Sequence, residues 1–66
     1  MSIAKVTEIT SMSSKSFEAA VEEGVARASK TIRNIKSVWI QDQEAIVDNG
    51  KVTAFKVSMK LTFVVE

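Results

Sequence analysis

The sequence predicts an α+β fold in which a three-stranded antiparallel sheet wraps around one helix, in the order β-α-β-β. Three observations support this prediction. Apolar and polar side chains alternate weakly over residues 3–10, and apolar side chains recur at spacings of three and four over residues 14–32. Two long alternating runs then flank an Asn49-Gly50 pair. Because the chain has 66 residues, we treat residues 1–66 as a single domain.

The first strand is expected over residues 3–10, where apolar and β-branched side chains predominate. Residues 10–14 are mostly polar, and we predict that they form a loop. Ser13 or Ser14 is a suitable helix N-cap, because a serine hydroxyl can accept hydrogen bonds from the free amides of the first helical turn. The loop is therefore expected to lead directly into the helix.

The helix is expected from residue 14 to about residue 32. Its apolar stripe is thin and is made of Phe17, Ala20, Val21, Gly24, Val25, Ala28 and Ile32. Gly24 costs about 1 kcal/mol relative to alanine in a helix interior, so its presence indicates close packing against the sheet. Glu23 and Arg27 have the spacing of a favourable ion pair on one helix face. Asn34 can adopt the left-handed conformation that ends helices.

The second and third strands are predicted as a hairpin of residues 36–47 and 51–65. Asn49-Gly50 suits a two-residue type I′ turn, because both residue types tolerate positive φ. Asp48 then faces Lys51, and the register pairs Val38 with Leu61, Trp39 with Lys60, Ile40 with Met59, and Gln43 with Lys56. A β-bulge would shift this pairing, since one extra residue changes which side chains face each other.

One face of this hairpin is polar, and it supplies the candidate ligand-binding residues Ser37, Trp39, Gln41, Gln43, Lys56 and Ser58. Trp39 is either an aromatic platform for a planar ligand or an interface residue with a cation–π contact to Lys60. Lys56 favours an anionic group on the ligand. A solvated polar face explains the same pattern, so both interpretations are carried forward.

Composition excludes several classes of function. The chain has neither cysteine nor histidine, so disulfides, thiolate metal sites and a Ser/His/Asp triad are ruled out, and we predict that it is not an enzyme. A net charge of +1 gives no footprint for nucleic acid. No signal peptide or membrane-spanning run is recognised, so we expect a cytoplasmic protein.

Three acidic residues lie on the second predicted strand, at Asp42, Glu44 and Asp48. Calcium needs several oxygen ligands, so these carboxylates could hold it only if symmetry-related copies completed the site. Salt bridges between subunits are the simpler explanation. We therefore predict no metal site within one chain.

The predicted lengths indicate self-association. A helix of about 18 residues is roughly 27 Å long, whereas a strand of about 14 residues spans roughly 46 Å. One helix cannot cover so long a ribbon, and exposed apolar surface and open strand edges favour assembly with further copies of the chain. A strongly curved ribbon that wraps its own helix is the competing explanation.

The chain resembles the dodecin family, whose members are small β-α-β-β proteins that form hollow homododecamers and bind flavins. The resemblance covers nearly the whole chain and is carried by KVTEI at 5–9, SFEAA at 16–20, VARASKTI at 25–32 and FKVSMKLTF at 55–63. It implies a homododecamer with pockets between subunits and with FMN or riboflavin as the first candidate ligands. Coenzyme A or another anionic aromatic compound is the next candidate.

Two positions depart from the flavin-binding pattern. In flavin-binding dodecins a tryptophan early in the second strand stacks on the isoalloxazine ring, and a glutamine on the third strand bonds its polar edge. Those positions correspond to Ser37 and Lys56 here. Serine offers no π-face and lysine offers no acceptor, although Trp39 lies two residues further on the same predicted face.

Three functions therefore remain open. The first is a small-ligand binding or storage assembly. The second is a flavin-free assembly that binds calcium or serves a structural role, since the chain is closer to the dodecin subgroup without the stacking tryptophan, some members of which are described as calcium-binding. The third is a protein-interaction module that uses a free sheet edge.

Overall fold

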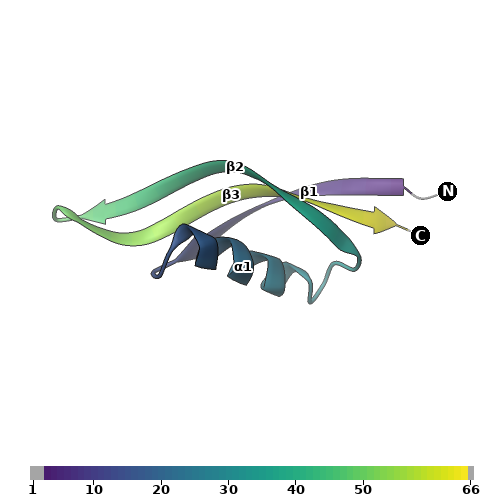
Figure 1. Cartoon of the computed structure of the whole chain (residues 1–66), viewed down its shortest axis with the longest axis horizontal. Coiled ribbons are helices and arrows are strands. Elements are labelled where there is room, and N and C mark those ends of the chain that lie inside the picture. Colours follow the sequence, from purple (N-terminus) through teal and green to yellow (C-terminus); the bar gives the residue numbers. More distant parts are fainter. Residues whose placement is uncertain (1–2, 66) are drawn as a thin grey trace.

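A computed structural model describes residues 3–65 as one helix packed against one face of a three-stranded antiparallel sheet (Figure 1). The elements in chain order are β1 (Ile3–Ser13), α1 (Phe17–Ala28), β2 (Ile35–Asp48) and β3 (Lys51–Val65). The strand order in the sheet is β1-β3-β2, so both outer strands pair antiparallel with β3. The predicted β-α-β-β fold with one helix is confirmed.

The start of α1 differs from the prediction. β1 continues through residues 10–13, which were predicted to be a loop, and Ser13 pairs with Phe55 on β3. The N-cap is Ser16, whose hydroxyl accepts a hydrogen bond from the Ala19 amide at 2.9 Å. The Ser13 hydroxyl instead accepts from the Lys15 amide at 3.1 Å and thereby shapes the turn before the helix. The prediction of Ser13 or Ser14 as the cap was wrong.

The end of α1 also comes earlier than predicted. Ser29 is the C-cap, and its amide donates to the Val25 carbonyl at 2.9 Å. Beyond it, the amides of Thr31 and Ile32 both donate to the Ala28 carbonyl, so the chain closes into a tight turn instead of continuing the helix. Asn34 has a φ of 61°, the predicted left-handed conformation, but it lies just before β2 and not at the helix end.

The hairpin turn forms as predicted. Asn49 and Gly50 have φ values of 53° and 78°, and Asp48 pairs with Lys51. The predicted pairs further along the hairpin are also present, namely Val38 with Leu61, Trp39 with Lys60, and Ile40 with Met59. The register is therefore correct near both ends of the long β2–β3 ribbon, although a further shift before Ser37 leaves Lys36 as an extra residue on β2.

Between these ends the register is shifted by one residue. The pairing passes from Val47–Val52 to Ile46–Ala54, which leaves Thr53 as an extra residue on β3. It later passes from Asp42–Ser58 to Ile40–Met59, which leaves Gln41 as an extra residue on β2. Because the two β-bulges lie on opposite strands, their shifts cancel. The predicted pair of Gln43 with Lys56 is wrong, since Gln43 faces Val57 and Glu44 faces Lys56.

The core lies between α1 and the middle strand, where Ala20, Val57, Met59 and Leu61 are fully buried. Phe17 and Phe55 close one end of it, with their ring centroids 5.0 Å apart in an edge-to-face arrangement. At Gly24 a Cβ atom would lie 2.6 Å from the Met59 methyl group and 2.9 Å from Ser11 Cβ. The close approach that Gly24 predicted is therefore confirmed.

The sheet extends well beyond the helix. The molecule measures 52 × 19 × 13 Å, whereas the 12 residues of α1 span about 18 Å. Figure 1 shows the sheet bending over α1 while the hairpin end and the end with the two termini project past it. Curvature therefore does not remove the mismatch in length. Large apolar side chains stay exposed at both ends and on the face opposite α1, namely Ile3, Val6, Met12, Trp39, Val47, Val52 and Val65.

Candidate ligand-binding site

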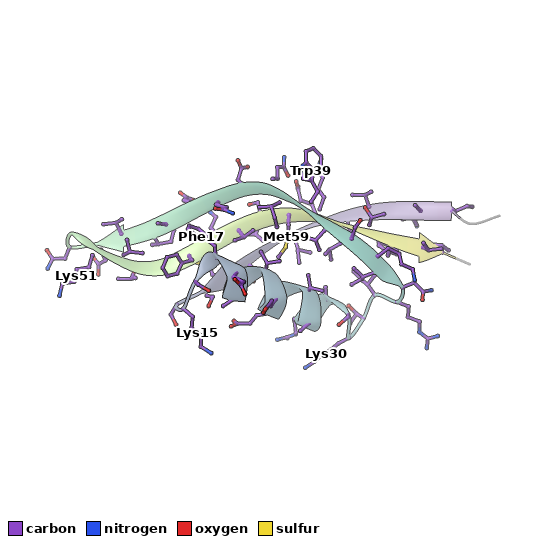
Figure 2. The ribbon with its side chains drawn as sticks, viewed as in Figure 1. Lys15, Phe17, Lys30, Trp39, Lys51 and Met59 are labelled. Carbon is purple, nitrogen blue, oxygen red and sulfur yellow. The ribbon has the colours of Figure 1, made fainter. Side chains whose placement is uncertain are left out.

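The candidate site lies on the face of the sheet opposite α1, which we call the outer face. Directly paired residues of an antiparallel sheet project to the same side, so the register defines its rows across β1, β3 and β2. These rows are Val6–Thr62–Ser37, Glu8–Lys60–Trp39, Thr10–Ser58–Asp42 and Met12–Lys56–Glu44. Figure 2 shows Trp39 on this face, on the side of the sheet away from α1.

Trp39 is the largest aromatic surface of the outer face, with 65% of the residue exposed. The Lys60 ammonium group lies 5.4 Å from the centre of the Trp39 ring, which forms the predicted cross-strand cation–π contact. Such a contact is worth about 0.5–1 kcal/mol at an exposed position, so it orients the indole without burying it. The exposed part of the ring can therefore stack on a planar ligand or pack against another subunit.

Lys56 has an ionic partner that the sequence register did not give. Its ammonium nitrogen lies 3.1 Å from Glu44 Oε1, with 37% of the lysine and 59% of the glutamate side chain exposed. An exposed pair of this kind contributes about 0.2–1 kcal/mol to stability. The pair exists because the bulge at Gln41 moves Glu44 onto the outer face. The opposite charges of Glu44 and Lys56 could have indicated this pair from the sequence, but only if a bulge in β2 had been assumed.

The row between Lys56 and Lys60 contains two hydroxyl groups and a carboxylate, from Thr10, Ser58 and Asp42. The Thr10 and Ser58 hydroxyl oxygens lie 3.5 Å apart, and Asp42 is the strand neighbour of Ser58 on the other side. Each of these groups can hydrogen-bond a ligand, because hydroxyls both donate and accept while the carboxylate accepts. The outer face therefore combines one aromatic surface with a row of hydrogen-bonding groups.

The structure brings together four of the six candidate residues, namely Ser37, Trp39, Lys56 and Ser58. Gln41 is the extra residue of a bulge, and Gln43 is paired with buried Val57 on the side of the sheet that faces α1. Asp42 and Glu44 take the place on the outer face that the predicted register gave to the two glutamines. The ligand-binding roles of these residues remain predictions.

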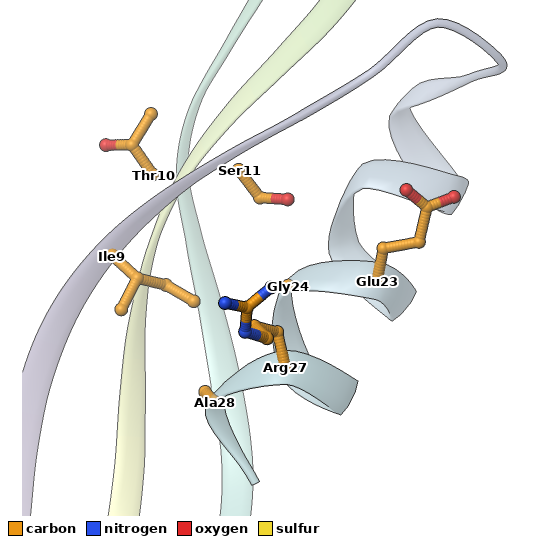
Figure 3. Close-up of a pocket in the computed structure, with 7 residues that line it drawn as sticks. All are labelled: Ile9, Thr10, Ser11, Glu23, Gly24, Arg27 and Ala28. Atoms are coloured by element: carbon orange, nitrogen blue, oxygen red, sulfur yellow. The ribbon is translucent and has the colours of Figure 1, made fainter. Parts of the chain in front are cut away.

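A separate groove of about 260 Å³ lies between β1 and α1, lined by Ile9, Thr10, Ser11, Glu23, Gly24, Arg27 and Ala28. Figure 3 shows Arg27 extending toward β1 while Glu23 turns away from it. The predicted Glu23–Arg27 ion pair does not form. Within residues 3–65, the ion pair with a nitrogen–oxygen distance below 4.0 Å is Lys56–Glu44. None of the six candidate residues lines this groove.

Metal binding finds no support in the described part of the chain. Among residues 3–65, no group of three or more acidic, histidine or cysteine side chains is placed to hold an ion. Glu44, one of the acids considered for calcium, is already paired with Lys56.

The one helix described between residues 3 and 65 is too short and too polar to span a lipid bilayer.

Comparisons with known proteins agree on the fold. The family model described as Dodecin matches residues 3–66. The dodecin from Streptomyces davaonensis is 25% identical over 98% of this chain and 96% of its own, with a TM-score of 0.94. The dodecin from Streptomyces coelicolor is 29% identical over 98% of this chain and 93% of its own, also with a TM-score of 0.94. A variant of T. thermophilus dodecin has the same fold, with a TM-score of 0.93. It is 24% identical over 100% of this chain and 98% of its own. No curated protein sequence matches the chain.

Proposed function

Because this chain belongs to the dodecin family, we propose that it is a homo-oligomeric binding or storage protein for a small planar ligand of the flavin class. The resemblance implies twelve copies, and the ligand pockets would lie between subunits. We propose a binding role and not catalysis, since the outer face offers hydrogen-bonding and stacking groups but no histidine or cysteine. The cytoplasmic location stays a prediction from the sequence.

The observation that carries this proposal is the exposed Trp39 ring beside hydrogen-bonding groups on the outer face. Ligand sites are typically concave and mostly apolar, with a few convergent polar groups. In one chain the outer face is an open sheet surface, so it becomes a pocket only when a second copy faces it. Assembly and ligand binding are therefore parts of the same proposal.

Because the chain has serine in place of the stacking tryptophan, Trp39 would have to supply the stacking surface for a flavin. Ser37 occupies the position of the stacking tryptophan, and it lies one row away from Trp39 on the same face. Two residues along a strand correspond to about 7 Å, so stacking on Trp39 would shift a planar ligand by that distance along β2. Riboflavin and FMN are the first ligands to test, because both present a flat ring system for such stacking.

Titration of the assembled protein with riboflavin and FMN tests the proposal. We expect saturable quenching of both flavin and tryptophan fluorescence, because Trp39 is the one tryptophan of the sequence and reports directly on stacking. Replacing Trp39 with leucine should weaken flavin binding by about five- to 150-fold, which corresponds to the loss of about 1–3 kcal/mol of aromatic stacking.

Val47→Leu is the matched control, because Val47 is exposed at the hairpin end and away from Trp39. It should leave the flavin affinity unchanged. Absence of quenching at tens of micromolar flavin, in protein whose assembly is intact, would remove flavins as the ligand class.

A further inference from the structure

The charges of the outer face do not form a cationic patch. The four paired rows of this face hold five charged residues, namely Glu8, Asp42, Glu44, Lys56 and Lys60, so three negative and two positive charges give these rows a formal net charge of −1. Lys56 is engaged by Glu44 at 3.1 Å, and Lys60 lies over the Trp39 ring with Glu8 as its strand neighbour. Each lysine therefore has an acidic side chain beside it.

This arrangement changes which ligands the face can accept. The predicted register placed Lys56 opposite neutral Gln43, which favoured an anionic ligand, whereas the bulge at Gln41 places Glu44 opposite Lys56. A phosphate group that approached Lys56 would have to displace Glu44 and would also meet Asp42 in the neighbouring row. An uncharged planar ligand meets the Trp39 ring and the Ser58 hydroxyl without that electrostatic cost.

We propose that the outer face selects uncharged planar ligands over their phosphorylated forms, and that Glu44 sets this selection. The proposal rests on the proposed function, because it assigns the ligand charge at the same site. A dianionic phosphate about 8 Å from a net charge of −1 in water should lose roughly fivefold in affinity relative to the uncharged ligand. The preference should shrink as salt is raised, since exposed charges are screened within about 8 Å at physiological ionic strength.

Riboflavin and FMN are suitable probes because they share one ring system and differ by a phosphate group. Parallel titrations of the assembled protein at low ionic strength should show riboflavin binding about fivefold more tightly than FMN. Glu44→Gln removes one negative charge and frees Lys56. It should strengthen FMN binding about five- to tenfold, leave riboflavin binding unchanged, and so abolish or reverse the preference.

Two further variants keep the test specific. Asp48→Asn removes the same charge at the hairpin turn, away from the outer-face rows, and should leave the ratio of the two affinities unchanged within about twofold. Lys56→Gln leaves Glu44 without its partner and should weaken FMN about fivefold relative to riboflavin. The mass of each assembled variant is measured first, so that a change in affinity is not confused with loss of assembly.

The outcomes separate the two proposals. If both flavins bind but FMN binds as tightly as riboflavin, or if Glu44→Gln moves the ratio no more than Asp48→Asn does, charge selection by Glu44 is wrong while flavin binding stands. If neither flavin binds to the intact assembly, the proposed function itself fails and the charge selection fails with it.

Discussion

Gly24 and Gly50 are both required, but for different physical reasons. Gly24 lies in the middle of α1, where a Cβ atom would come within 2.6 Å of Met59 and 2.9 Å of Ser11. Gly50 lies in the hairpin turn with a φ of 78°, and a Cβ atom there would meet nothing within 4 Å. The first glycine therefore permits close packing, and the second permits a left-handed backbone.

Substituting alanine at Gly24 should destabilise the protein. Alanine gains about 1 kcal/mol of helix propensity, but overpacking a core costs about 1–3 kcal/mol. The Met59 methyl group can move, whereas Ser11 Cβ is fixed to the backbone of β1, so we expect a net loss of about 1 kcal/mol. Denaturant unfolding at a fixed protomer concentration measures this change.

The matched variant is Gly50→Ala. It should cost a similar amount, about 1–2 kcal/mol, through the left-handed conformation alone. The two variants differ in which second substitution offsets the loss: removing the Ser11 Cβ atom with Ser11→Gly should reduce the cost of Gly24→Ala and leave the cost of Gly50→Ala unchanged. Stabilisation of the protein by Gly24→Ala would show that α1 does not pack as closely on the sheet as described.

The serine-rich turn before α1 shows how neighbouring polar residues divide their roles. Ser13 shapes the turn through the Lys15 amide, and Ser16 caps the helix through the Ala19 amide. Sequence pattern alone could not distinguish these serines, because each has the hydroxyl that an N-cap requires. The extent of β1 determines which serine caps the helix. Because β1 pairs with β3 as far as Ser13, the first helical turn begins only after the turn that follows.

Ser16→Ala should therefore lower the free energy of unfolding by about 1 kcal/mol, the usual value of a lost N-cap. Ser14→Ala is the control, since Ser14 is exposed and lies between the two serines with these hydrogen bonds. It should change stability by less than about 0.5 kcal/mol. Thermal or denaturant unfolding distinguishes the two, and a larger effect at Ser14 would restore the cap predicted from the sequence.

The β2–β3 ribbon shows which part of the site could be predicted. The Asn49-Gly50 turn fixes the register at one end, and the apolar alternation near Ile40 fixes it at the other, so Trp39 and Lys60 were placed correctly. The bulges at Gln41 and Thr53 carry no glycine or proline that would mark them. Glu44 was therefore assigned to the wrong face, and the ion pair with Lys56 could not be predicted.

The molecule that the structure describes is extended for its size. Its radius of gyration is 13.5 Å, whereas about 11 Å is expected for a compact domain of 66 residues. Its accessible surface is 4911 Å², compared with about 4,100 Å² for a typical monomer of 7.2 kDa. The excess, about 800 Å², is similar to what one partner contributes to a standard protein interface. These values support association with further copies of the chain.

The need for neighbours could be predicted from the sequence because helix and strand lengths can be estimated from it. α1 is even shorter than expected, at 12 residues, which strengthens the prediction. Which surfaces meet could not be predicted, since apolar side chains are exposed at the hairpin end, at the terminal end and on the outer face alike. The same uncertainty applies to the ligand pocket, which needs a second copy over Trp39.

The mass of the purified protein in solution, measured by sedimentation or light scattering at micromolar concentration, tests most directly whether the sheet is completed by further copies. We expect one oligomeric species many times heavier than 7.2 kDa, and twelve copies would give about 86 kDa. A stable, folded species of 7.2 kDa would contradict the proposed assembly and, with it, the ligand pockets between subunits.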